Sequence, residues 1–443
     1  KNLFIMQPTL LKLLAKQPQS AKELTQQLNI SQPTLSRLVK QQPAIIKIGK
    51  ARATQYALQR PIRDIGSQWP VYRVNEQANI SLAGQLIAIY PHSFVWHDAL
   101  TQNDTLYESL PWFLWDIRPQ GFLGREFSAI HQQLGLNPRL QDWQDDDVLT
   151  FLLKFGFVQP SHFLVGEESC LSFLRLQQDV LQPDEEDGWL KTRASYGQEA
   201  CKVIRHDIAR SSAAGEQPKF GLFVLEQQQA FELLVKFSPP LATVNGQRWS
   251  DLLIAEHLAL QTLQHFGIAA AQSQIVQTAG RTFLEVLRFD RTTSFGRKGM
   301  VSLEAVSNEF IGHNKAWDEQ AKSLLALNKI NVDDYQNILK VFSFGRLIAN
   351  EDMHNGNLSF FLAADFSLSL APVYDMLPMR FAPTIHGEVV EREIKPVQAS
   401  ALSQHVWSEV CVWATYYWQQ VAHHPQISDE FRAIAEQYGR MMG

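Results

Sequence analysis

The chain has 443 residues, 45% of them hydrophobic, which is enough to bury a large core and predicts two or three domains. Its net charge of −5 gives no overall attraction for nucleic acid, so any such binding has to be confined to one part of the chain. Three scattered cysteines favour a reducing compartment, and no apolar run approaches the length of a membrane span, so we expect a cytoplasmic protein without a membrane partner.

The pattern of residues 1–60 predicts a small separate domain of three helices and a β-hairpin. Ser20 and Glu23 have the spacing of a capping box at the start of the second helix. The runs 45–48 and 54–58 flank a glycine-containing turn, as the two strands of a hairpin do. This order of elements is typical of a winged helix-turn-helix domain.

Charge supports DNA binding by this domain. Up to Leu58 it holds nine lysine and arginine residues and one acidic residue, Glu23, although the whole chain is acidic. In that case the third helix would lie in the major groove and present the polar side chains of Gln32, Thr34, Ser36 and Arg37. The hairpin would carry the cations Lys50 and Arg52 to phosphate. The alternative is a winged helix that serves only as a protein-docking surface.

Residues 61–290 predict a mixed unit of helices and strands, and residues 291–443 predict a mainly helical one. Alternating apolar stretches such as 86–90 indicate a sheet in the first of these units. The acidic run 145–147 is best explained as a helix start, where carboxylates interact favourably with the helix dipole.

Two features of the mixed unit suit the binding of phosphate. Residues 211–219 contain small side chains and Gly215, and such a backbone can approach phosphate closely. Lys236 lies inside the apolar strand 231–237, where an ammonium group is costly unless it meets an anion. Kinases carry a phosphate-binding lysine in such a strand, and Glu256 on the next helix is a candidate partner. A surface hairpin and an edge-strand lysine that reaches water are the alternatives.

The stretch 350–358 and the later Asp375 have the spacing of a phosphoryl-transfer site. Asp352 is followed five positions later by Asn357, as the catalytic Asp and a magnesium-binding Asn are in protein kinases. Asp375 comes after the next apolar segment, where a second magnesium ligand belongs. Magnesium prefers few protein oxygens together with phosphate and water. The alternative is a polar loop with a helix cap at Asp352 and a turn at Asp375.

Taken together, five segments in this order resemble the HipA-like kinases, the serine/threonine kinase toxins of bacterial toxin–antitoxin systems. The resemblance covers about residues 61 to 440, and its carriers are Ser212–Lys219, Val235–Phe237, Arg288–Arg291, Asp352–Asn357 and Pro372–Asp375. It implies an α+β chain with a two-lobed HipA-like protein-kinase fold, preceded here by the small winged helix-turn-helix domain. Residues 61–290 would form the N-lobe, and residues 291–443 the helical C-lobe with the catalytic loop.

The resemblance also implies a role for each matching residue. Asp352 corresponds to the catalytic aspartate, Asn357 and Asp375 to the magnesium ligands, and Ser212 to a serine that is autophosphorylated. ATP would be held by the phosphate loop, the strand lysine and the connection between the lobes, through Ala213, Ala214, Gly215, Glu216, Gln217, Lys219, Lys236 and Phe289.

The implied cofactors are therefore ATP and Mg²⁺, and the implied activity is phosphorylation of a protein. The substrate would be an aminoacyl-tRNA synthetase or another translation component, so that the toxin inhibits translation or growth. A HipB-like antitoxin would be a partner, and the N-terminal domain would bind DNA for autoregulation.

Two positions depart from the family pattern. Pro218 replaces an acidic residue in the phosphate loop, and Leu287 stands where family members often have Glu. They keep open a second hypothesis, a DNA-binding transcriptional regulator whose HipA-like body is catalytically degenerate. A small-molecule kinase of the aminoglycoside type, which shares similar catalytic spacing, is a third.

Overall fold

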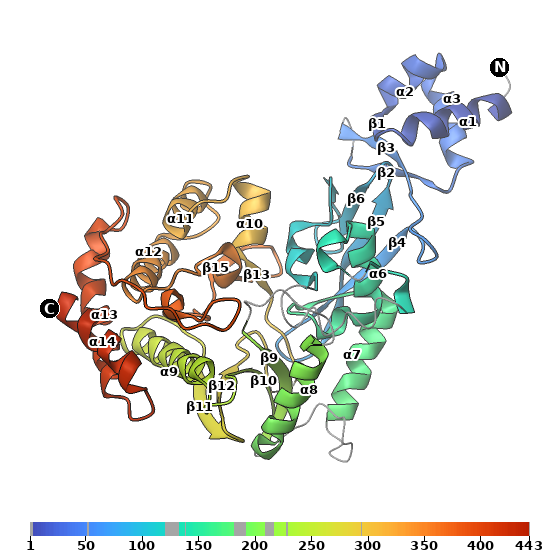
Figure 1. Cartoon of the computed structure of the whole chain (residues 1–443). Coiled ribbons are helices and arrows are strands. Elements are labelled where there is room, and N and C mark those ends of the chain that lie inside the picture. The colour runs from blue at the N-terminus through green and yellow to red at the C-terminus, as the bar shows by residue number, and fades with distance from the viewer. Residues whose placement is uncertain are drawn as a thin grey trace.

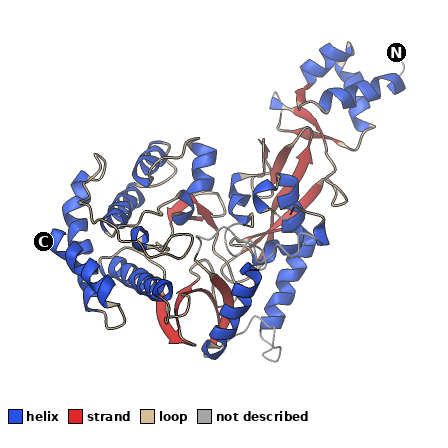
Figure 2. Cartoon of the chain, in the orientation of Figure 1, coloured by secondary structure: helices blue, strands red, loops and turns tan. Residues whose placement is uncertain are grey.

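The computed structural model describes residues 3–50, 53–119, 133–137, 139–180, 192–208, 217–226, 229–293 and 295–442 (Figure 1). Helices and strands are mixed in these ranges, and Figure 2 shows the strands gathered into separate groups flanked by helices. The N-terminal unit projects from one end of the molecule, and the C-terminus lies on the opposite side (Figure 1). In these ranges no helix combines the length and the apolarity that crossing a membrane requires.

The N-terminal unit combines helices with a sheet of strand order β1-β3-β2. The predicted capping box is present, because the Glu23 amide donates to the Ser20 hydroxyl at 3.3 Å and the Ser20 amide donates to the Glu23 carboxylate at 2.7 Å. Leu10, Leu24 and Leu35, one from each helix, are buried together in a core of the unit's own. The elements are α1 (Leu3–Leu14), β1 (Gln19–Ser20), α2 (Ala21–Leu28), α3 (Gln32–Lys40), β2 (Ile45–Ile48) and β3 (Gln55–Leu58).

The second part of the chain is built on an antiparallel sheet of order β7-β6-β5-β4-β8. Along β5, Leu86 and Ala88 point into the main core, whereas Ile87 and Ile89 face the other side of the sheet. The acidic run 145–147 begins α6, as predicted. The elements are β4 (Gln68–Val74), β5 (Ile80–Ile89), β6 (Ser93–Asp98), β7 (Asp104–Tyr107), α6 (Asp145–Phe155), β8 (Phe163–Val165) and α7 (Gly166–Val180).

The third part contains a separate antiparallel sheet of order β11-β12-β10-β9. Its long helix α9 begins at Val244, because Thr243 caps it by accepting the Gly246 amide hydrogen at 3.0 Å. The elements are α8 (Tyr196–Ile208), β9 (Lys219–Glu226), β10 (Gln229–Phe237), α9 (Val244–His265), β11 (Ser273–Thr278) and β12 (Arg281–Leu287).

The C-terminal part is mainly helical and carries a small sheet of order β13-β14-β15. Trp413 and Trp418 are buried in its core, whereas Trp407 is partly buried. The elements are β13 (Met300–Ser302), α10 (Leu303–Phe310), α11 (Trp317–Ala326), α12 (Val332–Leu347), β14 (Ser359–Leu362), β15 (Leu368–Leu370), α13 (Trp407–His423) and α14 (Asp429–Met442).

A cluster of buried and partly buried charges, which we call the arginine cluster, joins the second and third parts. Arg288 contacts both oxygens of Asp290, at 3.0 and 2.7 Å, and Glu232 at 2.8 Å. Arg291 contacts the same two carboxylates, at 2.7 and 3.1 Å, and donates to the backbone oxygen of Gln159 at 2.9 Å. Because Gln159 lies between α6 and β8, these contacts fix the end of β12 against the second part of the chain.

Candidate active site

Lys236 on strand β10 is held between two carboxylates, one from helix α9 and one from the loop after β15. Its ammonium nitrogen lies 2.7 and 2.8 Å from the oxygens of Glu256 and 2.5 Å from Oδ1 of Asp375. Lys236 is only 4% exposed and Glu256 1%. An ammonium group so buried is stable only when it is paired, and the predicted pairing of Lys236 with Glu256 is confirmed.

The charges of these three residues do not balance. Burial opposes the charge of Lys236, but Asp375 and Glu256 outweigh burial and raise its pKa. Burial acts against Asp375 as well, yet the ammonium groups of Lys236 and Lys219 lower its pKa to about 2. The pKa of Glu256 is raised, because burial and the neighbouring Asp375 charge exceed the effect of Lys236. Two carboxylates thus share one buried ammonium, and the cluster has surplus negative charge.

The loop after helix α12 brings Asp352 and Asn357 together. The side-chain oxygen of buried Asn350 accepts the Asp352 amide hydrogen at 3.0 Å. The Asn357 side-chain nitrogen donates to the Asp352 carbonyl oxygen at 2.9 Å, which leaves the amide oxygen of Asn357 available to a ligand. Burial raises the pKa of Asp352, His354 opposes that effect, and Asp375 adds to it. The charge of Asp375 thus contributes to the raised pKa of Asp352.

Asp375 is held in an uncommon backbone conformation. Its φ of +57° lies in the left-handed region, which Asp tolerates better than most residues but which still costs energy. The preceding Tyr374 is anchored, since its hydroxyl donates to the Gly356 carbonyl at 2.6 Å and lies 2.6 Å from the Ser359 hydroxyl. This anchor links the Asp375 loop to the Asp352 loop, and sequence reasoning missed it.

Helix α11 and the turn before it support the Asp352 loop. The Asn355 side chain donates to Asn314 at 2.9 Å and accepts from Gln320 at 2.8 Å. The Trp317 indole donates to the His354 carbonyl at 3.3 Å. Sequence reasoning missed these supporting residues too, because amides and one tryptophan, spread over some forty positions, form no motif. They hold the loop at two adjacent residues, through the carbonyl of His354 and the side chain of Asn355.

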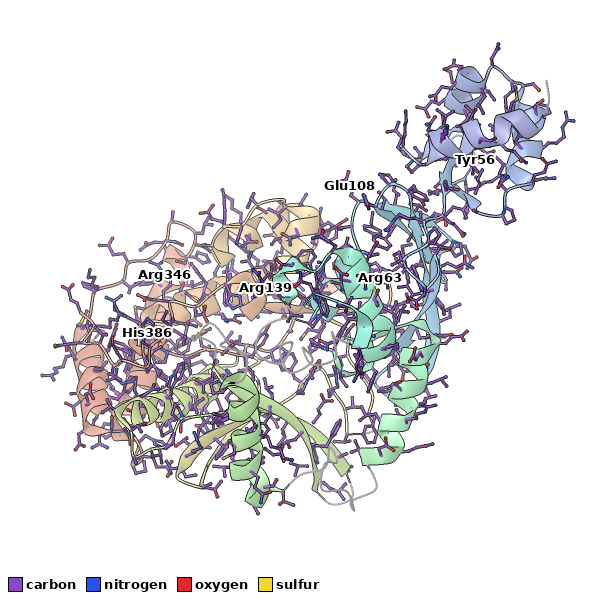
Figure 3. The ribbon with its side chains drawn as sticks, turned by 45° about the vertical axis from the view of Figure 1, so that its right-hand side comes forward. Tyr56, Arg63, Glu108, Arg139, Arg346 and His386 are labelled. Atoms are coloured by element: carbon purple, nitrogen blue, oxygen red, sulfur yellow. The ribbon has the colours of Figure 1, made fainter. Side chains whose placement is uncertain are left out.

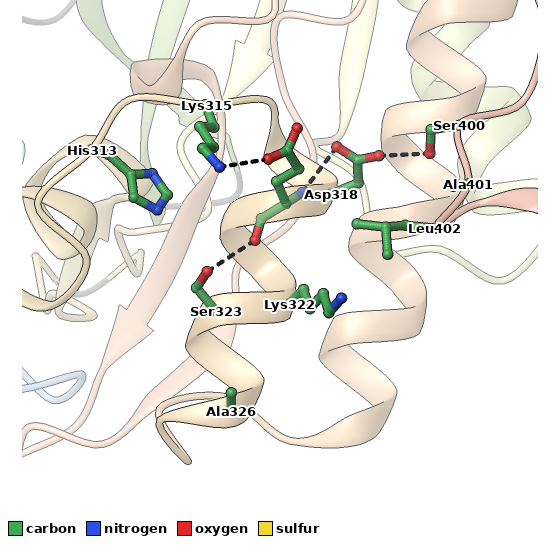
Figure 4. A pocket seen from close by; sticks show the side chains of 10 residues that line it. His313, Lys315, Asp318, Lys322, Ser323, Ala326, Ser400, Ala401 and Leu402 are labelled. Atoms are coloured by element: carbon green, nitrogen blue, oxygen red, sulfur yellow. Dashed lines mark hydrogen bonds and ion pairs between the residues drawn. The ribbon is translucent and has the colours of Figure 1, made fainter.

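Helix α11 also borders a surface pocket of about 560 Å³ (Figure 4). The pocket is lined by none of the predicted site residues. Its charged groups are largely paired, since Asp318 accepts the Ser400 hydroxyl at 2.6 Å and Lys315 lies 3.0 Å from Glu319. The candidate active site therefore lies around Lys236, and not in this pocket.

The predicted phosphate loop falls mostly outside the described residues. Ser212 and the segment Ala213–Glu216 are not described, so these predictions stay predictions. Gln217 is described, and its side-chain amide donates to the Phe237 carbonyl at 2.5 Å at the end of β10. Lys219 begins β9 directly opposite the strand lysine, and its charge contributes to the lowered pKa of Asp375. The end of the predicted loop thus lies beside Lys236 and Asp375.

Phe289 follows strand β12, where the third and C-terminal parts meet. Its ring centroid lies 6.0 Å from that of Phe361 and 5.9 Å from that of Tyr374. Its neighbours Arg288 and Asp290 belong to the arginine cluster, so the backbone at this connection is fixed on both sides. The structure brings Phe289 close to the Tyr374 anchor.

The predicted DNA-binding residues lie in the N-terminal unit, apart from the Lys236 site (Figure 1). On α3 the side chains of Gln32, Ser36 and Arg37 are exposed, and Thr34 is half-buried with its hydroxyl 2.9 Å from that of Ser31. The hairpin holds the other two predicted residues. Lys50 is exposed, and Arg52 lies outside the described residues.

Comparison with known proteins identifies the class. A family model described as "HipA-like C-terminal domain" matches residues 211–442, and one described as "YjjJ-like toxin, middle domain" matches residues 65–174. Toxin YjjJ of Escherichia coli K12 is 38% identical over 427 residues, which cover 96% of this chain and 95% of that protein. The chain therefore belongs to the HipA-like toxin family, as its motifs predicted.

The fold also resembles a solved member of that class. A chain in the complex of Shewanella oneidensis MR-1 HipA and HipB with operator DNA matches with a TM-score of 0.53. The match covers 84% of this chain and 95% of that one, at 16% sequence identity. At this identity the likeness concerns the fold, and it extends the family assignment to the arrangement of the sheets and helices.

Proposed function

We propose that this chain is an ATP- and magnesium-dependent serine/threonine protein kinase that acts as a HipA-like toxin. Membership of the toxin family supports the class. The observation that carries the catalytic assignment is the buried Lys236 ammonium, held by Glu256 and Asp375 beside the loop of Asp352 and Asn357. In kinases a lysine held in this way binds nucleotide phosphates, and the acidic loop faces the acceptor hydroxyl.

The donor set fits magnesium. Asp375 and the amide oxygen of Asn357 offer two oxygens of the hard type that the ion prefers, and the ion commonly completes such a set with phosphate and water. Burial is the main cause of the raised pKa values of Glu256 and Asp352, and the Asp375 charge adds to both, so a divalent cation would favour their ionised forms. When bound, magnesium would neutralise the phosphate charge that develops during transfer.

The remaining roles belong to side chains of this chain. Asp352 would orient the attacking hydroxyl and accept its proton, which suits a carboxylate whose side chain is exposed to solvent. Lys236 would position the phosphates, and Lys219 would add positive charge at the end of the phosphate loop. Autophosphorylation at Ser212 and phosphorylation of an aminoacyl-tRNA synthetase remain predictions from the family resemblance.

Transfer of phosphate from labelled ATP tests the assignment. The wild-type chain should label a protein substrate or itself when magnesium is present, and Asp375→Asn should abolish labelling. Titration with ATP and magnesium separates the alternative, because a degenerate body would show no saturable binding. Labelling by Asp375→Asn at the wild-type rate would exclude Asp375 from the site.

We propose a second function, DNA binding by a winged helix-turn-helix in the N-terminal unit. The supporting observation is that α3 presents Gln32, Ser36 and Arg37 to solvent on a unit that carries strong positive charge. The Shewanella HipA structure contains HipB and operator DNA, which supports autoregulation and a HipB-like antitoxin as further parts of the proposal.

The salt dependence of binding tests this function. Affinity for duplex DNA should fall steeply as salt is added, because bound lysine and arginine side chains displace counterions from phosphate. Arg37→Ala should weaken binding. Binding that is absent at low salt would leave the unit as a protein-docking module.

A further inference from the structure

The hairpin β2–β3 has two apolar faces. Strand residues alternate between faces, and the register pairs Ile45 with Leu58 and Ile46 with Ala57. Ile45 and Leu58 pack into the core of the N-terminal unit, under its helices. Ile46, Ile48 and Ala57 lie on the opposite face, the one that a free wing would expose to solvent. Apolar residues on that face are unexpected for a hairpin that only contacts DNA phosphates.

The second face is covered by the sheet of the body. Ile48 and Ala57 are buried in one cluster with Ile89 of β5 and Val95 of β6. Ile87 packs against the same cluster. These body residues share one face of their sheet, since Ile87 and Val95 are direct register partners. The hairpin is therefore a layer between two cores, with the helices on one side and the body on the other.

The tip of the hairpin is also hydrogen-bonded to the body. The Gly49 amide donates to Oδ2 of Asp104 at 2.9 Å, and the other oxygen of Asp104 lies 2.7 Å from Nδ1 of His97. Gly49 has a φ of +75°, which favours glycine at this turn. The Lys50 ammonium lies 3.4 Å from the side-chain oxygen of Asn103. The lysine that was predicted to reach DNA phosphate is thus turned toward the body.

The residues that follow the hairpin are bonded directly to the body. The Tyr90 amide donates to the Leu58 carbonyl at 2.9 Å, and the Arg60 amide donates to the Ala88 carbonyl at 2.9 Å. The Arg60 guanidinium is buried and holds both oxygens of Asp146 on α6, at 2.5 and 2.9 Å. The N-terminal unit is joined to the body by paired backbone and a bidentate ion pair.

We propose that the hairpin β2–β3 is a docking element, so that α3 alone reads duplex DNA, at an orientation fixed relative to the body. The proposal rests on the DNA binding proposed above and specifies which surface performs it. Charge agrees with this division, because DNA approaching the tip would meet the carboxylate of Asp104, which repels phosphate, and exposed Glu108 follows the same strand, β7. Glu108 lies on the side of the body toward the N-terminal unit that holds Tyr56 (Figure 3).

Two matched variants of the full chain test the proposal by the slope of log affinity against log salt. Arg37→Ala should reduce the slope by about one, as the loss of one phosphate contact does. Lys50→Ala should leave both the slope and the affinity unchanged within about twofold, although it removes the same charge. A slope that Lys50→Ala reduces by about one would overturn the proposal and leave DNA binding intact. Absence of DNA binding by the wild type would instead remove the DNA function.

Hydrogen exchange tests the docking without DNA. The Gly49 amide and the strand residues 45–48 should be protected in the wild type, and adding mixed-sequence duplex DNA should leave that protection in place. Asp104→Ala should lose protection at Gly49 while the buried core of the N-terminal unit keeps its own. Free exchange at Gly49 in the wild type, or protection gained there only with DNA, would show that the hairpin is an ordinary DNA-contacting wing.

Discussion

Glu256 offers the sharpest test of the buried charges, because it holds Lys236 without being a proposed magnesium ligand. Glu256→Gln keeps the shape of the side chain and leaves the ammonium paired with Asp375 alone. Asp375 would then be drawn away from the metal, and we expect phosphate transfer to fall about 10²-fold, as when one preorganised charge contact is lost.

The control for this variant is Glu409→Gln, the same change in an exposed pair with Lys340. Both variants should be compared by kcat/KM for ATP at saturating magnesium. Equal values of kcat/KM for Glu256→Gln and the control would mean that the pairing of Lys236 with Glu256 on α9 does not contribute to phosphate transfer.

The pKa of Asp352 should determine how the rate of phosphate transfer falls at acid pH. Burial and the nearby Asp375 raise its pKa above the ordinary value of 3.8. A general base works only when deprotonated, so the rate should fall as pH drops through this raised pKa and not through 3.8. The measurement is kcat against pH with saturating ATP. A rate that stays constant down to pH 4 would contradict the role, and the residual activity of Asp352→Asn should lack this acid limb.

At the residue scale, spacing along the sequence predicted part of the candidate site. It did not predict the contacts between residues that become neighbours only in the folded chain. The interval from Asp352 to Asn357 is short, so a loop can close it, and the structure joins the two residues by a hydrogen bond. The Lys236–Glu256 pair was also predictable, because a strand lysine needs an anion and the next helix supplies one. The Tyr374 anchor has no such signal, since its partner Gly356 becomes adjacent only when the small sheet forms.

The arginine cluster predicts a large effect on stability. Asp290 is buried, and although burial opposes its charge, Arg288 and Arg291 lower its pKa. Asp290→Asn leaves two guanidinium groups with one carboxylate fewer, and breaking a buried pair costs about 3–5 kcal/mol. Urea unfolding should show this loss, while Asp429→Asn, in an exposed pair with Arg432, should have little effect.

The same residue sets the pH at which this stabilisation disappears. A carboxylate with a lowered pKa stabilises the fold fully above its unfolded value of about 3.8, and the contribution is lost as pH falls further. The wild type should therefore lose stability more steeply than Asp290→Asn below pH 4. Parallel acid unfolding curves for the two proteins would contradict the lowered pKa.

At the scale of elements, caps and apolar runs predicted where helices and strands lie, but the sequence did not reveal how the strands group. Ser20 with Glu23 and the run 145–147 mark helix starts through contacts within one turn. The two large sheets are different, because β8 pairs with β4 across most of the second part of the chain. Such pairing depends on tertiary contacts such as that of Arg60 with Asp146, which alternation along a strand does not encode.

The molecule as a whole places the proposed DNA surface and the proposed kinase site on different units, joined by a docked hairpin (Figure 1). The helical face of α3 belongs to the basic N-terminal unit, while Asp352 lies in the acidic remainder of the chain. Charge of opposite sign on the two units would direct DNA to the basic unit and away from the proposed nucleotide site.

This separation predicts that each function can be removed alone. Arg37→Ala should weaken binding of mixed-sequence duplex DNA and leave phosphate transfer within about twofold of the wild type, because α3 lies in the projecting N-terminal unit, apart from the strand β10 that carries Lys236 (Figure 1). Asp352→Gln should abolish transfer and keep the wild-type slope of DNA affinity against salt. Fluorescence anisotropy and labelled-ATP assays on the same preparations decide the matter. Loss of both functions in either variant would show that the docked hairpin couples them, and that the rigid junction transmits a change from one unit to the other.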